Sequence, residues 1–218
     1  PFRYDLINTG REILAEISTV FSIRFAQALD AKPLDSSMVN RTGRAYVDLL
    51  LDLDQLVATD SSFLLGPWLR DARAWGVLNG STMFDCTGTV IDSVLAGNCS
   101  RFLEWNARTQ LTTWYPTIKG KPMPLRDTDY ARKHWSPLVK DYYARRAAML
   151  LDQALTDAEA SKPLDTAAVL RLRAQLAYDW TTRTDNYPEV PAPDPVGVSK
   201  AARAKYAAMF ASCDTELS

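Results

Sequence analysis

The stretch YDLINTGREILAEISTVFSIRFAQA, residues 4–28, decides the fold class of this chain. Its apolar residues recur three and four positions apart, which is the period of one face of an α-helix. They are Leu6, Ile13, Leu14, Ile17, Val20, Phe21 and Phe25. The stretch therefore predicts one long amphipathic helix. The Lys32-Pro33 step ends it, because proline lacks the backbone N–H that a helix interior needs.

The same period continues through the rest of the chain, and no alternating pattern long enough for a strand interrupts it. Further helices are predicted from Ser36 or Ser37 to Val57, from 63 to 75, up to Trp114, from Asp127 or Thr128 to about Leu155, from Thr166 to Trp180 and from Val198 to Phe210. Residues 76–100 lose the pattern and are interpreted as an insertion. The predicted fold is all-α: an irregular bundle of about six to seven helices that forms a single domain over residues 1–218.

The composition is that of an ordinary soluble globular domain, with 218 residues, 47% hydrophobic and 23% charged. Both signs of charge are interspersed and the net charge is −1, so nucleic acid is not an expected partner. No apolar run approaches the roughly 20 residues that span a bilayer, and no membrane span is predicted. The chain starts at Pro1 without a signal-peptide pattern, and we expect that cleavage of a longer polypeptide produced this start.

Three sequons and two nearby cysteines bear on the cellular compartment. The sequons begin at Asn40, Asn79 and Asn98, each near a predicted loop or helix end, which makes each a candidate glycosylation site. Cys86 and Cys99 lie close enough for a local disulfide that would pin the insertion. The alternative is a pair of free buried thiols in a cytosolic protein. Sequons and cysteines together favour a lysosomal or secreted glycoprotein.

No metal or cofactor site is predicted, because three cysteines and the single histidine, His134, have no zinc-type spacing. Cys213 is either free or bonded to another chain. Asp52 and Asp54 are two residues apart on a predicted helix and point in different directions, so they are interpreted as a solvated face and not as a catalytic pair.

Residues near the middle of the chain suggest a binding role. In FLEWNARTQLTTWYP, residues 102–116, Pro116 disfavours helical geometry at Tyr115, so the helix opens into a loop at Trp114. An aromatic ring at such a helix end can hold a sugar ring, or it can cap the core. Asp127 and Asp129 flank Tyr130 and are interpreted as a helix cap and a structural residue, not as an acid and base pair. His134 is placed on the same helix face as Tyr130 and is interpreted as a surface or core residue.

Four blocks in order resemble the C-terminal helical domain of the alpha-N-acetylglucosaminidases, which form family 89 of the glycoside hydrolases. They are FRYDL at 2–6, ATDSSFLLGPWL at 58–69, WNARTQLTTW at 105–114 and DYARK at 129–133. The resemblance runs closely from Phe2 to about Leu155 and more loosely to Phe210.

The resemblance implies part of an exo-hydrolase that removes terminal alpha-linked N-acetylglucosamine with retention of configuration. Retention requires two carboxyl groups about 5 to 5.5 Å apart. In the family these are glutamates on a TIM barrel, which needs roughly 250 residues of alternating strands and helices. This chain shows no such alternation, so no catalytic residue is assigned to it, and the barrel is expected as a separate chain or domain.

By the same resemblance, Trp114 and Tyr130 are the substrate-binding residues. A Trp face stacks on the apolar face of a sugar ring, and a Tyr hydroxyl can donate a hydrogen bond to it. Both rings could instead belong to the core. The chain departs from the family pattern in its longer loop from Tyr115 to Arg126.

Two functions therefore stay open. The chain is either the pocket-lining C-terminal part of such an enzyme or a stand-alone helical interaction or carbohydrate-binding module. The first predicts a large apolar face that the barrel covers, and six tryptophans in one small domain favour such a face.

Overall fold

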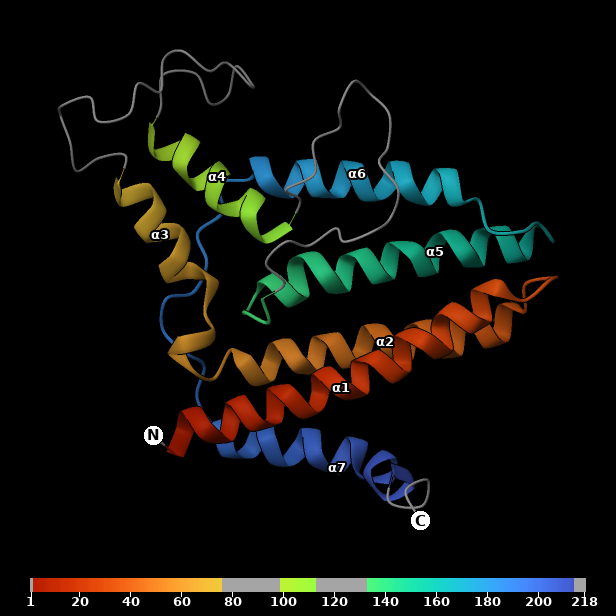
Figure 1. The fold of residues 1–218 in the computed structure, drawn as a ribbon, viewed down its shortest axis with the longest axis horizontal. Helices are drawn as coiled ribbons and strands as arrows, with labels where there is room; N and C mark the ends of the chain where they lie inside the picture. The colour runs from red at the N-terminus through yellow and green to blue at the C-terminus, as the bar shows by residue number, and fades with distance from the viewer. Residues whose placement is uncertain (1, 76–98, 113–132, 214–218) are drawn as a thin grey trace. The chain divides into compact units, whose positions relative to one another are not determined.

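A computed structural model of the chain describes residues 2–75, 99–112 and 133–213 (Figure 1). These ranges contain α-helices and no strand, with one isolated bridge between Leu64 and Ser136. The α-helices are α1 (Phe2–Asp30), α2 (Ser36–Val57), α3 (Leu65–Trp75), α4 (Cys99–Thr112), α5 (Arg145–Glu159), α6 (Thr166–Thr182) and α7 (Pro195–Cys213). A 3-10 turn, η1 (Ser61–Phe63), and a π-helical turn, η3 (Val139–Ala144), complete the elements. The all-α prediction is confirmed, while nearly all of the predicted insertion lies outside the described residues.

The chain groups into two compact units that exchange segments. The first comprises Pro1–Leu64, His134–Leu170 and Val190–Ser218, and the second comprises Leu65–Lys133 and Arg171–Glu189. The α6 helix belongs to both, because the division falls between Leu170 and Arg171. The single domain expected over residues 1–218 stays a prediction.

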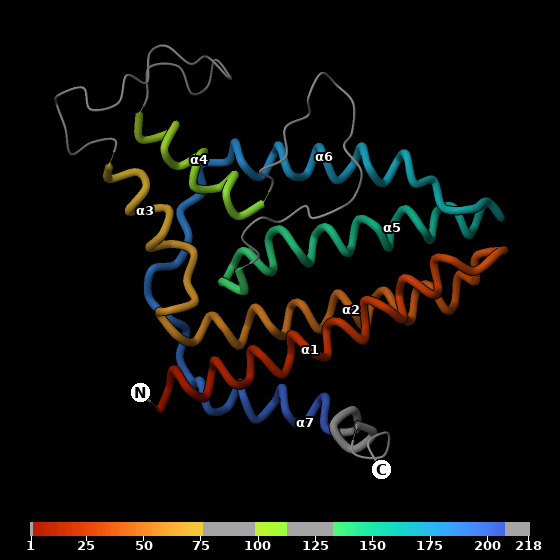
Figure 2. Tube along the Cα trace, in the orientation of Figure 1, coloured from red at the N-terminus to blue at the C-terminus, as the bar shows by residue number. Residues whose placement is uncertain are grey.

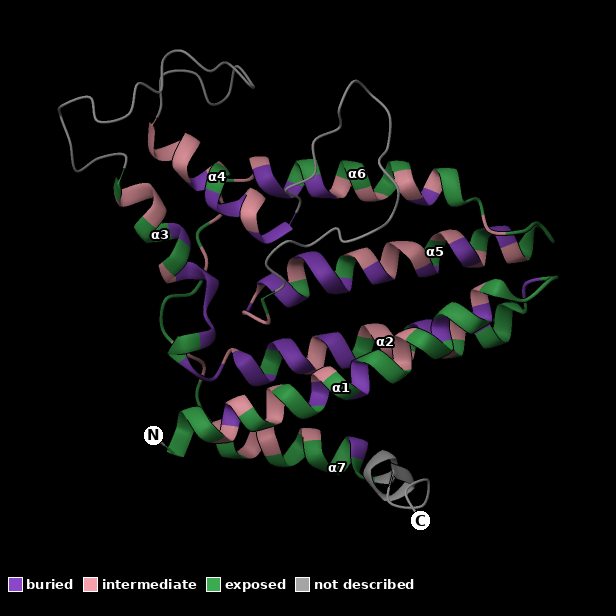
Figure 3. Cartoon of the chain, in the orientation of Figure 1, coloured by how far each residue is buried: buried purple, intermediate pink, exposed green. Residues whose placement is uncertain are grey.

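The first unit is built around α2. A short turn reverses the chain after α1, so α1 and α2 run antiparallel and in contact (Figure 2). Their apolar stripes bury Ile7, Leu14, Ile17 and Phe25 from α1 and Val39, Leu49, Leu50, Leu53 and Leu56 from α2. The α5 and α7 helices also contact α2. Buried positions concentrate on α2, whereas α7 is largely exposed or half-buried (Figure 3). The helical period of the sequence thus predicts the buried face correctly.

Aspartates cap two of these helices. The Asp35 carboxylate accepts a hydrogen bond from the Met38 N–H at 3.0 Å, so the cap of α2 is Asp35 and not Ser36 or Ser37 as predicted. Asp194 accepts from the Gly197 N–H at 2.8 Å in the same way, just before α7 begins at Pro195. Proline suits a first helical position, since that N–H has no helical partner.

The helix predicted from Asp127 or Thr128 is wrong in its described part. Residues 133–135 are not helical, and helical structure begins at Leu138, after Pro137. The Ser136 N–H instead donates to the Phe63 carbonyl at 2.8 Å. The physical reason is the Ser136-Pro137 step, because proline disfavours helical geometry in the residue before it. His134 is therefore not on a helix, and its Nδ1 lies 3.3 Å from Nη1 of Arg11.

In the second unit, α3 packs on α4. The start of α3 confirms that Pro67 lies in a first helical turn, where proline is tolerated. A neighbouring residue, Gly66, contacts the chain at Tyr187 and Pro188 closely. A Cβ at Gly66 would lie 2.2 Å from the Pro188 carbonyl oxygen and 2.7 Å from that of Tyr187. Only glycine fits here without a backbone shift.

We expect Gly66→Ala to lower the free energy of unfolding by about 1 to 3 kcal/mol, because backbone atoms cannot move aside as a side chain can. The matched control is Gly10→Ala on α1, where an added Cβ meets only the flexible Leu56 side chain, at 2.9 Å. Denaturant unfolding followed by helical circular dichroism measures both. Equal stability of the two variants would contradict the close approach at Gly66.

Candidate functional site

The two predicted sugar-binding residues, Trp114 and Tyr130, lie outside the described residues, as do Asn79, Asn98 and Cys86. Each of the two rings is nevertheless next to a described segment. The α4 helix ends at Thr112, two residues before Trp114, and the chain is described again from Lys133, three residues after Tyr130. What holds these two segments in place is therefore the observable part of the candidate site.

The remaining predicted sites are described only in part. Asn40, the fifth residue of α2, is half-buried, and its side-chain oxygen accepts a hydrogen bond from Nε of Arg44 at 2.7 Å. Cys99, the first residue of α4, is disulfide-bonded. Its pairing with Cys86 stays a prediction, because Cys86 is not described.

A buried ion cluster holds α4. The Glu104 carboxylate accepts two hydrogen bonds from Arg73 of α3, both of 2.7 Å, in a bidentate pair. It also accepts from Nε and Nη2 of Arg108 at 2.9 and 2.8 Å. Glu104 is 3% exposed and Arg108 is fully buried. We call Arg73, Glu104 and Arg108 the triad.

The triad keeps its carboxylate ionised. Burial alone would raise the pKa of Glu104, but the hydrogen bonds from Arg73 and Arg108 outweigh that effect, and the pKa lies below its ordinary value. The hydrogen bonds to Glu104 raise the pKa of Arg73 in turn. Bidentate pairing of a guanidinium with a carboxylate fixes both distance and angle between the two groups.

Arg108 extends the triad to the chain at and after the end of α6. Its guanidinium donates to the Trp180 carbonyl at 3.4 Å and to the Asp185 carbonyl at 3.3 Å. It also lies over the rings of Trp180 and Tyr187, 4.9 and 5.4 Å from their centroids. Because arginine offers five donors and a flat face, this one side chain connects α4 to two parts of the chain.

The last turn of α4 is also well packed. Leu111 and Thr112 are buried, and the Thr112 hydroxyl donates to the Arg108 carbonyl at 2.8 Å. The helix therefore stays ordered and enclosed up to the point where the chain continues toward Trp114.

On the other side of Tyr130, Asp54 of α2 holds the chain at Pro137. One carboxylate oxygen accepts from the Ser136 hydroxyl at 3.0 Å, and the other accepts from the Lys140 N–H at 3.0 Å. Asp54 is 6% exposed, so the prediction that it belongs to a solvated face is wrong. Burial raises its pKa to about 6, against these hydrogen bonds, which lower it.

Asp52 points elsewhere, as predicted from its spacing. It accepts hydrogen bonds from Lys205 and Tyr206 of α7. Burial first, and then the Asp52 carboxylate, raise the pKa of Tyr206. The two aspartates thus connect α2 to different elements and form no catalytic pair.

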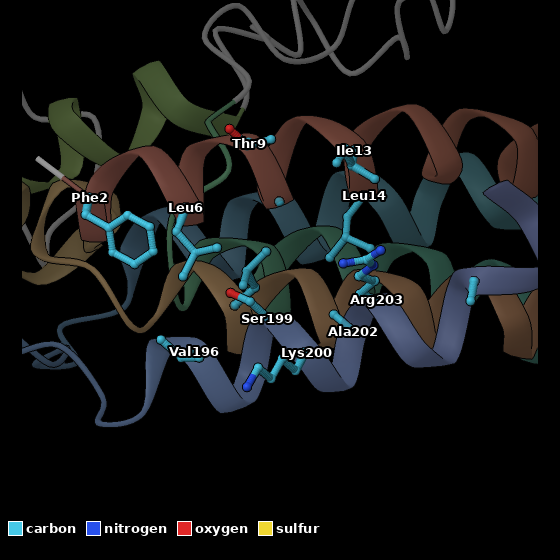
Figure 4. A pocket seen from close by; sticks show the side chains of 13 residues that line it. Phe2, Leu6, Thr9, Ile13, Leu14, Val196, Ser199, Lys200, Ala202 and Arg203 are labelled. Atoms are coloured by element: carbon cyan, nitrogen blue, oxygen red, sulfur yellow. The ribbon is translucent and has the colours of Figure 1, made fainter.

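An apolar groove of about 740 Å³ lies between α1 and α7 in the first unit. Figure 4 shows Phe2 and Leu6 of α1 facing α7, which contributes Val196, Ser199 and Ala202. Lys200 and Arg203 also line it. The sequence did not predict this groove. The tryptophans behave unequally: Trp68 and Trp75 are 40% and 60% exposed, whereas Trp180 is buried.

Asp54, Glu104 and Arg108 were missed as buried groups, although the sequence carries a signal for them. Glu104 and Arg108 share the helical stripe of Ala107 and Leu111, and these four positions are all buried. Asp54 lies in the same register as Leu50, Leu53 and Val57. A charge at a position of the apolar stripe indicates a buried ion pair or hydrogen-bonded carboxylate, because such a group is rarely buried without partners.

Two searches of the described residues found no further site. No group of three or more His, Cys, Asp or Glu in these ranges is placed to hold a metal ion. None of the helices in the same ranges is long and apolar enough to cross a membrane.

Comparisons with known proteins agree with the architecture. A human alpha-N-acetylglucosaminidase is 29% identical over 205 residues, which are 94% of this chain and 24% of the relative. A family 89 glycoside hydrolase from Clostridium perfringens, solved with its substrate GlcNAc-alpha-1,4-galactose, is 21% identical with a TM-score of 0.71, over 93% of this chain and 21% of that one. The Clostridium enzyme solved with 2-acetamido-1,2-dideoxynojirmycin is 22% identical with a TM-score of 0.69, over 94% and 21%.

The chain thus spans about a quarter of the length of its curated relative. Residues 1–205 match the family described as Alpha-N-acetylglucosaminidase (NAGLU) C-terminal domain. With nearly the whole chain matched and the helical architecture shared, this protein belongs to the family of alpha-N-acetylglucosaminidase C-terminal domains.

Proposed function

We propose that this chain is the C-terminal helical part of a retaining exo-alpha-N-acetylglucosaminidase and lines its sugar pocket with Trp114 and Tyr130. The observation that carries the proposal is the family match over residues 1–205, which includes the blocks that contain both rings. The ligands named for the Clostridium enzyme, a GlcNAc disaccharide and an acetamido iminosugar, support the same class of substrate.

The catalytic groups belong to a part of the enzyme beyond this chain. The relatives are about four to five times longer than the matched region, which leaves room for a TIM barrel of roughly 250 residues. Two glutamates on that barrel, about 5 to 5.5 Å apart, would act as acid and base and as nucleophile. The helical chain then contributes binding and orientation of the terminal sugar.

The apolar groove between α1 and α7 fits a chain that another part of the same enzyme covers. Phe2 and Val196 in its lining are 73% and 42% exposed, and apolar surface of this kind marks an interface. The alternative is a stand-alone carbohydrate-binding or interaction module. A native mass of the purified protein near that of this chain would favour the module, and a mass several times larger would favour the enzyme.

The compartment follows from the same proposal. A disulfide between Cys86 and Cys99 and glycans on Asn40, Asn79 and Asn98 fit a lysosomal or secreted enzyme. Peptide mapping of unreduced, glycosylated protein tests both modifications.

Trp114→Ala in the full-length enzyme should lower kcat/KM for an aryl alpha-N-acetylglucosaminide about 5- to 30-fold, because one stacking contact of roughly 1 to 2 kcal/mol is lost. Helical circular dichroism should not change. The matched control is Tyr178→Ala, which removes a ring of α6 that is 54% exposed and should leave the kinetics unchanged. Wild-type kinetics in the Trp114 variant would contradict the proposed function.

A further inference from the structure

The triad joins three segments of the second unit. Arg73 lies on α3, Glu104 and Arg108 lie on α4, and their remaining donors reach the chain at Trp180 and Asp185. Arg73 also donates to the Asp185 carbonyl and to the Asn186 side chain, both at 2.8 Å. Every contact is made by a group with strict angular preferences, so together they define both the rotation of α4 and its position along its axis.

Apolar side chains would stabilise this position at lower cost. Two guanidinium groups share one carboxylate, so the triad carries an excess positive charge that only carbonyl oxygens and aromatic rings compensate. Replacing buried ion clusters by apolar residues is often neutral or stabilising, which makes such a cluster weak support for a role in stability alone. What it provides in addition is one defined geometry, since a helix turned by one residue would separate Glu104 from Arg73.

That geometry ends next to the candidate sugar-binding ring. Arg108 is one turn before Thr112, whose hydroxyl returns to the Arg108 carbonyl, and Trp114 follows two residues later. Consecutive Cα atoms are about 3.8 Å apart, so the position of Thr112 restricts that of Trp114 to within roughly 8 Å. Placement of a substrate-contacting group to within an ångström can change a rate by a large factor.

We propose that Arg73, Glu104 and Arg108 are positioning residues that set the geometry of Trp114 against the sugar. This inference rests on the proposed function. The triad contacts no substrate itself and acts only through the end of α4.

A double-mutant cycle with Trp114→Ala in the full-length enzyme tests the inference. Glu104→Gln keeps the volume of the side chain but removes its charge, and Arg73→Lys keeps the charge but loses the bidentate fork. Each should lower kcat/KM about 5- to 10-fold in the wild-type background. In the Trp114→Ala background each should lower it less than about twofold, because the ring through which the triad acts is gone.

Arg73→Lys keeps the test decisive if Glu104→Gln does not fold, because the Arg73 side chain is 27% exposed and tolerates change. The matched control is Glu189→Gln, which breaks the exposed pair of Glu189 and Arg70, 2.7 Å apart in the same unit, and should change nothing in either background.

The outcomes separate the two proposals. Equal losses with and without Trp114 would mean that the triad only stabilises the fold, and the positioning role would be overturned while the proposed function stands. A Trp114→Ala variant with wild-type kinetics would overturn the proposed function and the positioning role with it.

Discussion

Glu104→Ala is expected to lower the free energy of unfolding of this chain by about 3 to 5 kcal/mol. The change removes the only carboxylate of the triad and leaves the fully buried Arg108 guanidinium without a counter-ion. Most of the cost is the uncompensated charge, not the lost hydrogen bonds, because the charge cannot reach water. Denaturant unfolding followed by circular dichroism measures the effect.

A double variant identifies that cause. Replacing Glu104 by Leu and Arg108 by Met removes both buried charges, and the remaining Arg73 can turn toward solvent. We expect the double variant to be more stable than Glu104→Ala alone, against the additivity that independent sites would show. The exposed control, Glu189→Ala, should cost less than about 1 kcal/mol. A Glu104→Ala variant as stable as this control would contradict the buried triad.

Asp54→Asn should change how stability depends on pH. Burial raises the pKa of Asp54 from 3.8 to about 6 in the folded chain. Between these two values the folded chain therefore holds a proton that the unfolded chain has lost. Stability from this group is fully present below about pH 4 and is lost as the pH rises through about 6.

The asparagine variant lacks this loss, since it does not ionise. Its stability relative to wild type should rise by about 2 to 3 kcal/mol between pH 4 and pH 7, at roughly 1.4 kcal/mol per pKa unit. The amide can still accept from the Lys140 N–H and donate to the Ser136 hydroxyl, so the variant should fold. The control is Asp48→Asn, an exposed aspartate of the same helix. A stability difference for Asp54→Asn that is flat over this pH range would contradict the prediction.

The helices were predictable because their buried stripes follow the helical period, as in α1, α2 and α6. The start of the helix after Tyr130 was missed although Pro137 carries the signal, because the apolar spacing from Tyr130 onward continued across it. The grouping into two units was not predictable. It depends on contacts between distant segments, such as those of Arg73 with Glu104 and Asp185, which no local pattern encodes.

The candidate site divides in the same way. The family resemblance assigned Trp114 and Tyr130 from short blocks, and this assignment is still a prediction. The groups that hold the neighbouring segments were visible only as charges on apolar stripes. Glu104 and Asp54 look like surface residues by type, and only their position relative to Leu111 and Leu53 indicates burial.

The most direct test of the proposed function is a crystal structure of the full-length enzyme with 2-acetamido-1,2-dideoxynojirmycin bound. We expect the Trp114 ring to contact the iminosugar ring within about 4.5 Å. The Tyr130 hydroxyl should lie within about 3 Å of a polar ligand atom. A structure in which both side chains pack inside the helical domain, away from the ligand, would contradict the claim that this chain lines the sugar pocket.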